Sequence, residues 1–318
     1  LWKGLLGPLT PRTLYVGGGT PSLLSPDEWG CLIALLEGLG DWSRLEEATV
    51  EANPSSLNDE LLDIWRDSFF TRISLGVQSL DDAELEALGR RHDARLALEA
   101  MERIARSGLR MSVDLIFGIP GQTLRSWAAS LRGVLDAGAR HVSAYQLTLE
   151  PDTPMGLRAP TLPDGYPLYR YAQWFLPRRG LIQYEISSYA PPGGECRHNL
   201  AYWRGGNWWG IGPGAHSHIG GVRFWNRKHP RSYAAALAGG HTPAQGREVL
   251  SLEDRRVERV MLELRLAEGL PLGVLTETES ARVEGIVAEG LGVVEEGRLL
   301  LTLRGRLLAD GVVLRLLD

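Results

Sequence analysis

The most constraining feature of this sequence is a regular alternation of short apolar runs with amphipathic helical patterns. The runs recur about every thirty residues, at residues 14–16, 48–51, 72–77, 111–117 and 141–147. Runs of this length and composition indicate β-strands, and we expect the first of them to be buried. The spacing leaves room for a crossover helix between successive strands, which parallel strands require. The sequence therefore predicts an α/β fold, either a (β/α) barrel or part of one, or a doubly wound sheet.

Apolar residues between these runs fall at helical spacing. Trp29 begins the first stripe and Leu36 ends it, and Cys31 is expected on the same apolar face. Two later stripes end near Gly108 and Gly138, where glycine commonly stops a helix. The three stripes comprise Trp29, Leu32, Ile33 and Leu36; Leu98, Met101 and Ile104; and Leu124, Trp127, Leu131 and Leu135.

Three glycines, residues 17–19, directly follow the first predicted strand and precede Thr20 and Pro21. Glycine places bare backbone at the carboxyl end of the strand, where N–H groups can approach a ligand without interference from a Cβ atom. Ser25 and Glu28 then have the spacing of a capping box at the start of a helix. This strand–loop–helix unit is where α/β proteins bind ligands, although one glycine run is equally compatible with a tight turn.

Polar residues stand at or near the ends of the later predicted strands. Glu51, Gln78 and Asp114 are the charged or amide-bearing examples, and Tyr145 and Gln146 belong to the fifth run. A single such residue is more often a cap or an ion-pair partner, but several at one sheet edge beside a glycine loop favour a ligand site. The expected ligand offers an ammonium or hydroxyl groups to the carboxylates.

Composition excludes several classes of protein. Of the 318 residues, 44% are hydrophobic and 23% charged, and no apolar run approaches the roughly 20 residues of a membrane-spanning helix. The start, residues 1–8, does not have the pattern of a signal peptide. The only cysteines, Cys31 and Cys196, indicate no disulfide framework, so a cytoplasmic location is expected. The formal net charge of −5 disfavours nonspecific nucleic-acid binding.

Five segments, in this order, resemble the radical S-adenosylmethionine (SAM) proteins of the coproporphyrinogen III oxidase-like family. They are GGGTPS at 17–22, VEANP at 50–54, RISLGVQS at 72–79, GRRH at 89–92 and DLIFGIPGQT at 114–123. The resemblance extends over nearly the whole chain and implies a partial parallel (β/α) barrel of the radical SAM type. It also implies SAM as a cofactor, bound by residues that match the family positions: Gly18, Gly19, Thr20, Glu51, Gln78, Arg90 and Asp114. Arg91 is the alternative to Arg90 as the arginine that binds SAM. Both arginines can also be interpreted as part of a solvated helix end that binds no ligand.

The resemblance also implies a [4Fe–4S] cluster, bound in that family through a Cys-x3-Cys-x2-Cys loop. Such clusters need several thiolates close together, and Cys31 and Cys196 are far apart in the chain. We interpret both as ordinary cysteines and expect the cluster cysteines to belong to an N-terminal segment absent from this chain. A homologue that lost the cluster is the rarer interpretation. The chain as it stands is not expected to perform radical chemistry.

Residues 198–203, His198-Asn199-Leu200-Ala201-Tyr202-Trp203, resemble the haem-binding segment His-Asn-x-x-Tyr-Trp of HemW-type haem chaperones within this family. An imidazole can ligate haem iron, and aromatic side chains can cover a porphyrin face. His198 is the expected iron ligand, with Asn199, Tyr202 and Trp203 around the haem, and His216 and His218 are reserve ligands. The alternative is that this segment, which lies near Trp208, Trp209 and Trp225, only packs an aromatic patch.

The composition changes near residue 248. The tail has helical spacing through Val257, Val260, Met261 and Leu264, followed by a predicted hairpin of residues 293–295 and 299–303. It carries fourteen Asp or Glu against nine Arg, which disfavours nucleic-acid binding and suits a lid or docking module. We therefore expect three segments: a partial radical SAM barrel at 1–175, a flanking segment at 176–247, and a small α+β, winged-helix-like domain at 248–318.

The resemblance implies a haem chaperone that binds haem and SAM and delivers haem to acceptor proteins, including membrane-associated respiratory proteins. The alternative function is oxygen-independent coproporphyrinogen III oxidation. A third hypothesis is a radical SAM protein acting on another substrate. The sequence leaves the oligomeric state and the acceptor open.

Overall fold

The computed structural model describes residues 9–318, which fall into two compact units. One unit comprises Thr10–Glu195, and the other comprises Cys196–Asp318 together with Leu9. The boundaries expected after residues 175 and 247 stay predictions, and the first eight residues of the expected first segment lie outside the described part of the chain.

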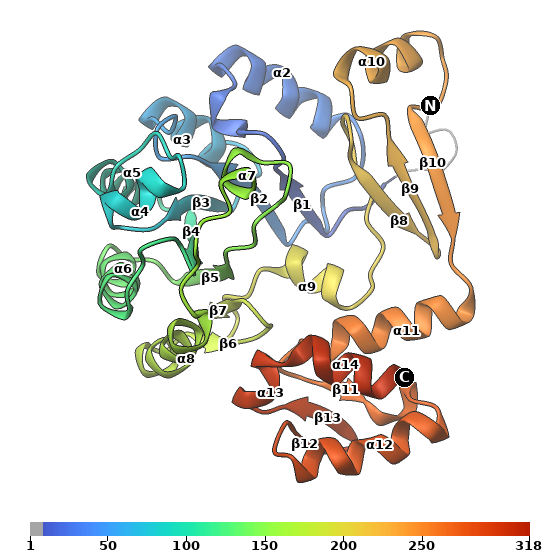
Figure 1. Ribbon diagram of the computed structural model, residues 1–318. Helices are drawn as coiled ribbons and strands as arrows, with labels where there is room; N and C mark the ends of the chain where they lie inside the picture. Colours follow the sequence, from blue (N-terminus) through green and yellow to red (C-terminus); the bar gives the residue numbers. More distant parts are fainter. Residues whose placement is uncertain (1–8) are drawn as a thin grey trace. The chain divides into compact units, whose positions relative to one another are not determined.

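The N-terminal unit is built on a seven-stranded sheet in the order β1-β2-β3-β4-β5-β7-β6 (Figure 1). The five strands expected from the sequence are all present, and each pairs with the next in parallel, so this prediction is confirmed. Two short antiparallel strands extend the sheet beyond β5. The strands are β1 (Thr13–Val16), β2 (Glu47–Ala52), β3 (Arg72–Gln78), β4 (Arg110–Phe117), β5 (His141–Gln146), β6 (Ile182–Gln183) and β7 (Ser188–Ala190).

Helices join these strands and cover one face of the sheet. Helix α5 packs on β3 and β4, and α8 packs on β4 and β5. Helix α2 starts with the expected capping box of Ser25 and Glu28, and α5 ends at Gly108 with a φ of 81°. The helices are α2 (Pro26–Glu37), α3 (Asp59–Arg66), α4 (Asp82–Ala87), α5 (Ala94–Ser107), α6 (Leu124–Asp136), α7 (Pro154–Arg158) and α8 (Gly165–Phe175), with short 3-10 turns η1 (Pro21–Leu23) and η2 (Pro177–Arg179).

Apolar and polar residues alternate along the parallel strands, and this alternation gives the sheet two different faces. In β4, Met111, Val113, Leu115 and Phe117 are buried, whereas the intervening positions carry mostly polar side chains such as Asp114. Because successive side chains point to opposite faces, one face packs on the helices and the other is polar. A polar inner face is what a ligand-binding barrel segment requires.

Two expectations about burial were wrong. Strand β1 is only partly buried, because among the described residues it pairs on one side only, with β2. Cys31 is exposed, because the buried side of α2 is formed by Trp29 and Leu36. Trp29 packs edge-on against the Trp65 ring, with ring centroids 5.3 Å apart.

Charged groups are buried at the amino-terminal side of the polar face. Arg72 Nη1 lies 3.2 Å from Glu47 Oε2, and neither side chain is more than 2% exposed. His141 Nδ1 lies 2.6 Å from Ser112 Oγ, and its Nε2 lies 2.9 Å from the Tyr184 hydroxyl. Burial holds the pKa of His141 well below its usual value, so the ring is neutral in this network.

The C-terminal unit contains two three-stranded sheets, in the orders β10-β9-β8 and β11-β13-β12. Helix α12 packs on α14 and on β12. The strands are β8 (His216–Ile219), β9 (Val222–Asn226), β10 (Ala244–Val249), β11 (Leu270–Pro271), β12 (Gly292–Glu295) and β13 (Arg298–Leu301). The helices are α9 (Arg197–Trp203), α10 (Pro230–Ala238), α11 (Leu252–Glu263), α12 (Glu277–Ala288), α13 (Leu303–Leu307) and α14 (Ala309–Leu317), with the 3-10 turn η3 (Leu272–Val274).

The expected hairpin near the C-terminus is confirmed as β12 and β13. Its two loop residues, Glu296 and Gly297, both have positive φ, of 48° and 74°. Two positive φ values match a tight hairpin turn whose twist suits the flanking strands. Strand β13 ends at Leu301 because the Thr302 side chain caps α13.

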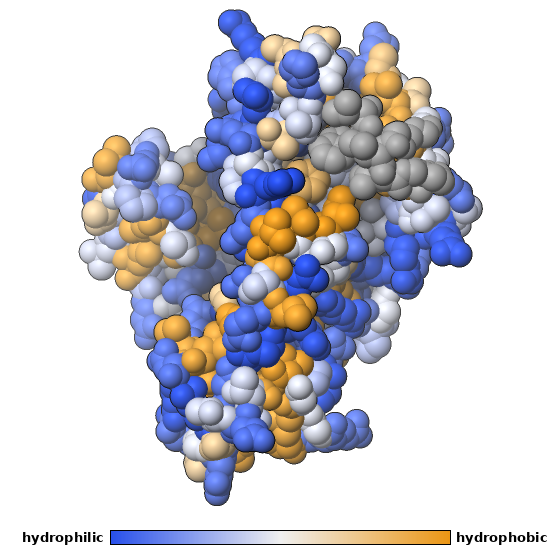
Figure 2. Space-filling view, turned by 90° about the vertical axis from the view of Figure 1, so that its right-hand side faces the viewer, coloured by the Kyte–Doolittle hydropathy of each residue, from blue (hydrophilic) through white to orange (hydrophobic). Residues whose placement is uncertain are grey.

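Several large apolar side chains reach the surface of the C-terminal unit, including Val249, Leu252 and Leu314. Figure 2 shows one face of the molecule, where hydrophobic groups lie among hydrophilic ones. Scattered exposure of this kind is ordinary and identifies no partner. None of the described helices has the length and apolar character needed to cross a membrane.

Candidate functional site

The glycine loop and Glu51 are held together at the carboxyl ends of β1 and β2. The Gly18 N–H donates to Glu51 Oε2 at 3.1 Å, and the Tyr15 hydroxyl donates to Glu51 Oε1 at 2.7 Å. A Cβ atom on Gly17 would stand 2.7 Å from Glu51 Cδ, and Gly18 has a φ of +113°. The positive φ of Gly18 favours glycine there, and a side chain at position 17 would displace the Glu51 carboxylate from its place beside the loop. Each carboxylate oxygen keeps a further lone pair for a ligand ammonium.

Gly19 and Thr20 continue the loop toward η1. A Cβ atom on Gly19 would meet nothing within 4 Å, so this part of the loop borders open space. The Thr20 side chain makes no capping bond to η1, while its carbonyl accepts from the Leu23 N–H at 2.9 Å. The loop thus presents its backbone at the strand end, as the sequence predicted for a ligand contact.

Gln78 ends β3 in an unusual conformation. Its φ is 69°, and the Ser79 N–H donates to the Val77 carbonyl at 2.9 Å, which makes a γ-turn around Gln78. A Cβ atom on Gly76 would stand 2.8 Å from Gln78 Nε2, so the amide lies over the bare backbone of its own strand. Non-glycine residues with positive φ are strained, and such strain concentrates at functional sites.

Asp114 lies on the polar face in register with Gly76 of β3 and Ser143 of β5. Its carboxylate Oδ2 accepts a hydrogen bond from Ser74 Oγ at 3.0 Å. Burial, with a smaller contribution from the nearby Glu51 charge, raises the pKa of Asp114 to about 6, against the lowering effect of the Ser74 and Ser143 hydroxyls. Glu51 and Asp114 thus lie near one another on the polar face, and their carboxylates suit a ligand that supplies hydroxyl or ammonium donors.

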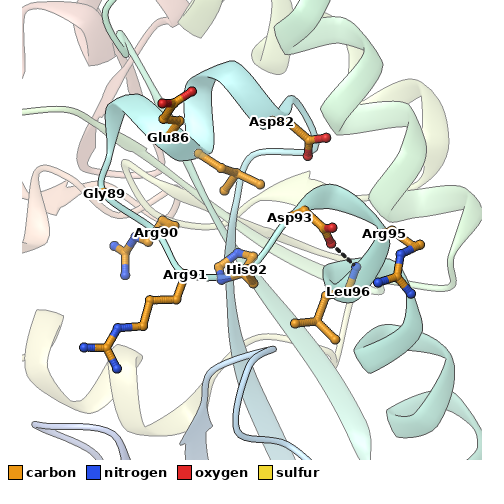
Figure 3. A pocket seen from close by; sticks show the side chains of 10 residues that line it. Asp82, Glu86, Gly89, Arg90, Arg91, His92, Asp93, Arg95 and Leu96 are labelled. Atoms are coloured by element: carbon orange, nitrogen blue, oxygen red, sulfur yellow. Dashed lines mark hydrogen bonds between the residues drawn. The ribbon is translucent and has the colours of Figure 1, made fainter.

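Arg90 lies in the turn between α4 and α5, which lines a shallow pocket (Figure 3). Arg90 and Arg91 are both exposed, and neither forms an ion pair with a described carboxylate. Partial desolvation lowers the pKa of Arg90. His92 is buried, and its Nε2 lies 3.1 Å from the carbonyl of Val77, so it ties this turn to the strand that carries Gln78. The pocket residues are Asp82, Leu85, Glu86, Gly89, Arg90, Arg91, His92, Asp93, Arg95 and Leu96.

Sequence reasoning missed part of this rim. Tyr15, Ser74 and Ser143 bond to the two carboxylates, but none of them was among the predicted site residues. All three occupy alternate positions of strands that were interpreted as uniformly apolar runs. Counting the two-residue period would have placed them on the same face as Glu51 and Asp114.

The predicted haem segment, residues 198–203, lies in α9, a seven-residue helix without a buried residue. His198 Nε2 lies 3.0 Å from the Tyr202 hydroxyl, and the two rings meet edge to face with centroids 4.9 Å apart. Tyr202 in turn meets Trp208 at 4.9 Å, again edge to face. Partial burial raises the pKa of Tyr202, so its phenol stays protonated and can hold the imidazole. Asn199 and Trp203 are partly exposed on the same helix.

The two reserve histidines differ in their surroundings. His216 is exposed and stacks on Trp225 with centroids 6.0 Å apart. His218 Nδ1 lies 3.1 Å from the Gly206 carbonyl, and its ring lies 5.0 Å from that of Trp208. The aromatic residues His198, Tyr202, Trp208 and His218 therefore form one continuous series of ring contacts within the C-terminal unit.

Comparison with known proteins places the chain in a family. Residues 9–132 match the family model of the radical SAM superfamily. The chain is 42% identical over 316 residues to the heme chaperone HemW of Mycobacterium tuberculosis. This alignment covers 97% of the chain and 81% of the relative. The chain is also 36% identical over 289 residues to the heme chaperone HemW of Escherichia coli, which covers 88% and 72%. The chain belongs to the HemW family of radical SAM proteins.

Among solved structures, coproporphyrinogen III oxidase HemN from Escherichia coli, a radical SAM enzyme, matches the fold of this HemW-family chain. The TM-score is 0.82 with 21% sequence identity, over 96% of this chain and 77% of HemN. The predicted family and the predicted radical SAM fold class are confirmed. At this level of identity the likeness to HemN concerns the fold and not the reaction.

The cofactor expectations differ in how well the residues fit them. The rim offers the carboxylates of Glu51 and Asp114, whose acceptor oxygens suit the ammonium and ribose hydroxyls of SAM. For the [4Fe–4S] cluster, the two cysteines lie in different units, and residues 9–318 contain no group of three or more His, Cys, Asp or Glu that could hold a metal ion. The described residues do not fit the cluster.

Proposed function

We propose that this HemW-family chain is a haem chaperone on a radical SAM scaffold, which binds haem and SAM and delivers haem to acceptor proteins. The observation that carries the proposal is its 42% identity, over 97% of the chain, to a protein named heme chaperone HemW. The partly exposed His198 and Tyr202 of α9 support it, because haem needs an accessible imidazole and aromatic surface. Membrane-associated respiratory proteins are the proposed acceptors, and a cytoplasmic location is proposed with them.

Haem is proposed to bind at His198, with Tyr202 orienting the imidazole through its hydroxyl. Trp203 contributes aromatic surface from the same helix, and Asn199 is the neighbouring polar group. Aromatic contact and area burial each contribute of order 1 kcal/mol to such a complex. A histidine whose second nitrogen is held by a protein group has a fixed orientation, which favours ligation.

SAM is proposed to bind at the rim of the N-terminal unit. Its ammonium would be held by Glu51 and the loop of Gly18, Gly19 and Thr20, and its ribose hydroxyls by Asp114. Gln78 and Arg90 complete the set, with the guanidinium suited to the carboxylate of the amino acid. In this proposal the thiolates that hold the family's [4Fe–4S] cluster come from outside the described residues.

The function is tested by offering both candidate porphyrin substrates to the full-length protein. Haem mixed with the protein should co-elute with it in gel filtration and show a shifted Soret band. Under anaerobic conditions with a reductant and SAM, coproporphyrinogen III should yield no protoporphyrinogen. Turnover within a decade or two of roughly 1 per second, together with failure to retain haem, would replace the chaperone proposal with the oxidase alternative.

A further inference from the structure

A single buried carboxylate connects the loops that follow β3 and β4. Glu84 of α4 is 3% exposed. Its Oε2 accepts from Ser79 Oγ at 2.6 Å and from Gln122 Nε2 at 2.9 Å, and its Oε1 accepts from Ser126 Oγ at 2.5 Å. No described Lys, Arg or His pairs with this carboxylate, so three hydroxyl or amide donors compensate its charge.

On the β3 side, this network holds the residue that follows the strained Gln78. The Ser79 side chain is fully buried; its hydroxyl donates to Glu84 and also accepts from the Asp81 N–H at 3.0 Å. The next N–H, of Leu80, donates to Ser130 Oγ at 3.0 Å. A strained conformation persists only where its surroundings determine it, and here the fixed position of Ser79 maintains the γ-turn at Gln78.

On the β4 side, the same carboxylate orients Gln122, which holds the loop after Asp114's strand. Gln122 Oε1 accepts from the Gly118 N–H at 2.7 Å, and its Nε2 donates to Glu84. Gln122 Nε2 also donates to the Ile116 carbonyl at 3.3 Å, so loss of the Glu84 carboxylate would remove the shorter of the two contacts that orient this end of the amide. Gly118 has a φ of 81°, a conformation that glycine adopts without a steric penalty, and its N–H is held by Gln122.

We propose that Glu84 is a positioning residue for the SAM rim, which it serves without touching the ligand. It sets Gln78 through Ser79, and it sets the loop at Gly118 through Gln122. Hydrogen bonds to a charged acceptor are stronger than neutral ones, so one carboxylate can fix two loops at once. The inference rests on the proposed binding of SAM at this rim.

The test is SAM binding by calorimetry to the full-length, cluster-loaded protein, with Glu84→Gln as the main variant. A glutamine directs an N–H group toward existing donors, so at least one contact is lost while the side-chain size is kept. We expect the affinity for SAM to fall by roughly 10-fold to 100-fold, because small misplacements of binding groups have effects of this size. Amide exchange at Leu80 and Gly118 should accelerate in the same variant. Glu102→Gln, a change at an exposed carboxylate of α5, is the matched control and should leave the affinity unchanged.

A reversed pair separates positioning from a general loss of stability. The double variant Glu84→Gln with Gln122→Glu exchanges the two groups. The carboxylate at position 122 accepts from the Gly118 N–H, and the amide at position 84 donates to that carboxylate. This double variant should recover the slow exchange at Gly118 and part of the lost binding free energy, because the acceptor of the Ser79 hydroxyl is not restored. If Glu84→Gln does not fold, Ser79→Ala and Ser126→Ala each remove one donor and should weaken binding separately.

The outcomes distinguish this inference from the proposed function. Absence of SAM binding to the parent protein would overturn both. Tight binding by the parent, by Glu84→Gln and by the two serine variants, with unchanged exchange at Gly118, would overturn the positioning role of Glu84 alone. Weakened binding that the reversed pair does not recover would also overturn it, because the loss would then reflect general destabilisation.

Discussion

The rim of the N-terminal unit and the haem segment of the C-terminal unit hold their candidate binding residues in different ways. Glu51 and Asp114 project from paired strands, and each is hydrogen-bonded to neighbours from other strands. His198 stands on a seven-residue helix that buries none of its residues, and its Nε2 lies 3.0 Å from the Tyr202 hydroxyl of the same helix. The rim carboxylates are thus positioned by contacts between strands, whereas this contact of His198 lies within its own short helix.

The largest expected effect follows from removing the two rim carboxylates. Glu51→Ala and Asp114→Ala should each weaken SAM binding by about 100-fold, because each carboxylate is proposed to make charge-assisted hydrogen bonds to the ligand. Calorimetry on the full-length, cluster-loaded protein measures this effect. Haem binding should be unchanged in both variants, and a parallel loss of haem would remove the distinction between the two regions.

The second effect concerns stability and pH. The pKa of Asp114 is raised from 3.8 to about 6, so the ionised carboxylate is less stable in the folded protein than in the unfolded chain. The protonated Asp114 side chain contributes stability that is fully present below about pH 4. This contribution is lost as the pH rises through 6 and the buried group ionises. Asp114→Asn should therefore leave stability nearly unchanged at pH 4 and raise it by of order 1–3 kcal/mol at pH 7. Urea unfolding of the ligand-free chain across this range measures the difference, and a pH-independent difference would refute the assignment.

The smallest effect separates two neighbouring arginines. Arg90→Ala should weaken SAM binding by about tenfold, since one guanidinium–carboxylate contact is lost, whereas Arg91→Ala should have little effect. Both residues are exposed in the same turn, so they form a matched pair. If Arg91→Ala causes the larger loss, the carboxylate contact belongs to Arg91. Equal, negligible effects would mean that this turn is only a solvated helix end.

The sequence predicted the parallel strands and the polar strand ends because both depend on local patterns. An apolar run followed by Glu51 or Gln78 can be identified without knowing any distant contact. The conformation of Gln78 could not be predicted, because its positive φ is maintained by Ser79 and Glu84, and Glu84 lies in the next helix. The partial burial of β1 and the exposure of Cys31 were missed for a similar reason, because both depend on which neighbours pack nearby.

For the haem segment, the sequence supplied the residues but not their arrangement. The contact of His198 with Tyr202 follows from helical spacing, because residues four apart share a helix face. Tyr202 also contacts Trp208, and Trp208 contacts His218. The second contact depends on a backbone pairing between Trp208 and His218, which no short sequence pattern reveals. The role of His198 as the iron ligand stays a prediction.

Haem titration of the full-length protein, followed by the Soret band, tests the central claim most directly. The parent should show a shifted Soret band, and His198→Ala should weaken or remove it. Trp203→Ala should weaken binding without changing the ligation state, and His216→Ala is the control that should retain the shift. Retention of the shifted band and of full affinity in His198→Ala, with the fold intact, would contradict the account and leave the aromatic series as packing.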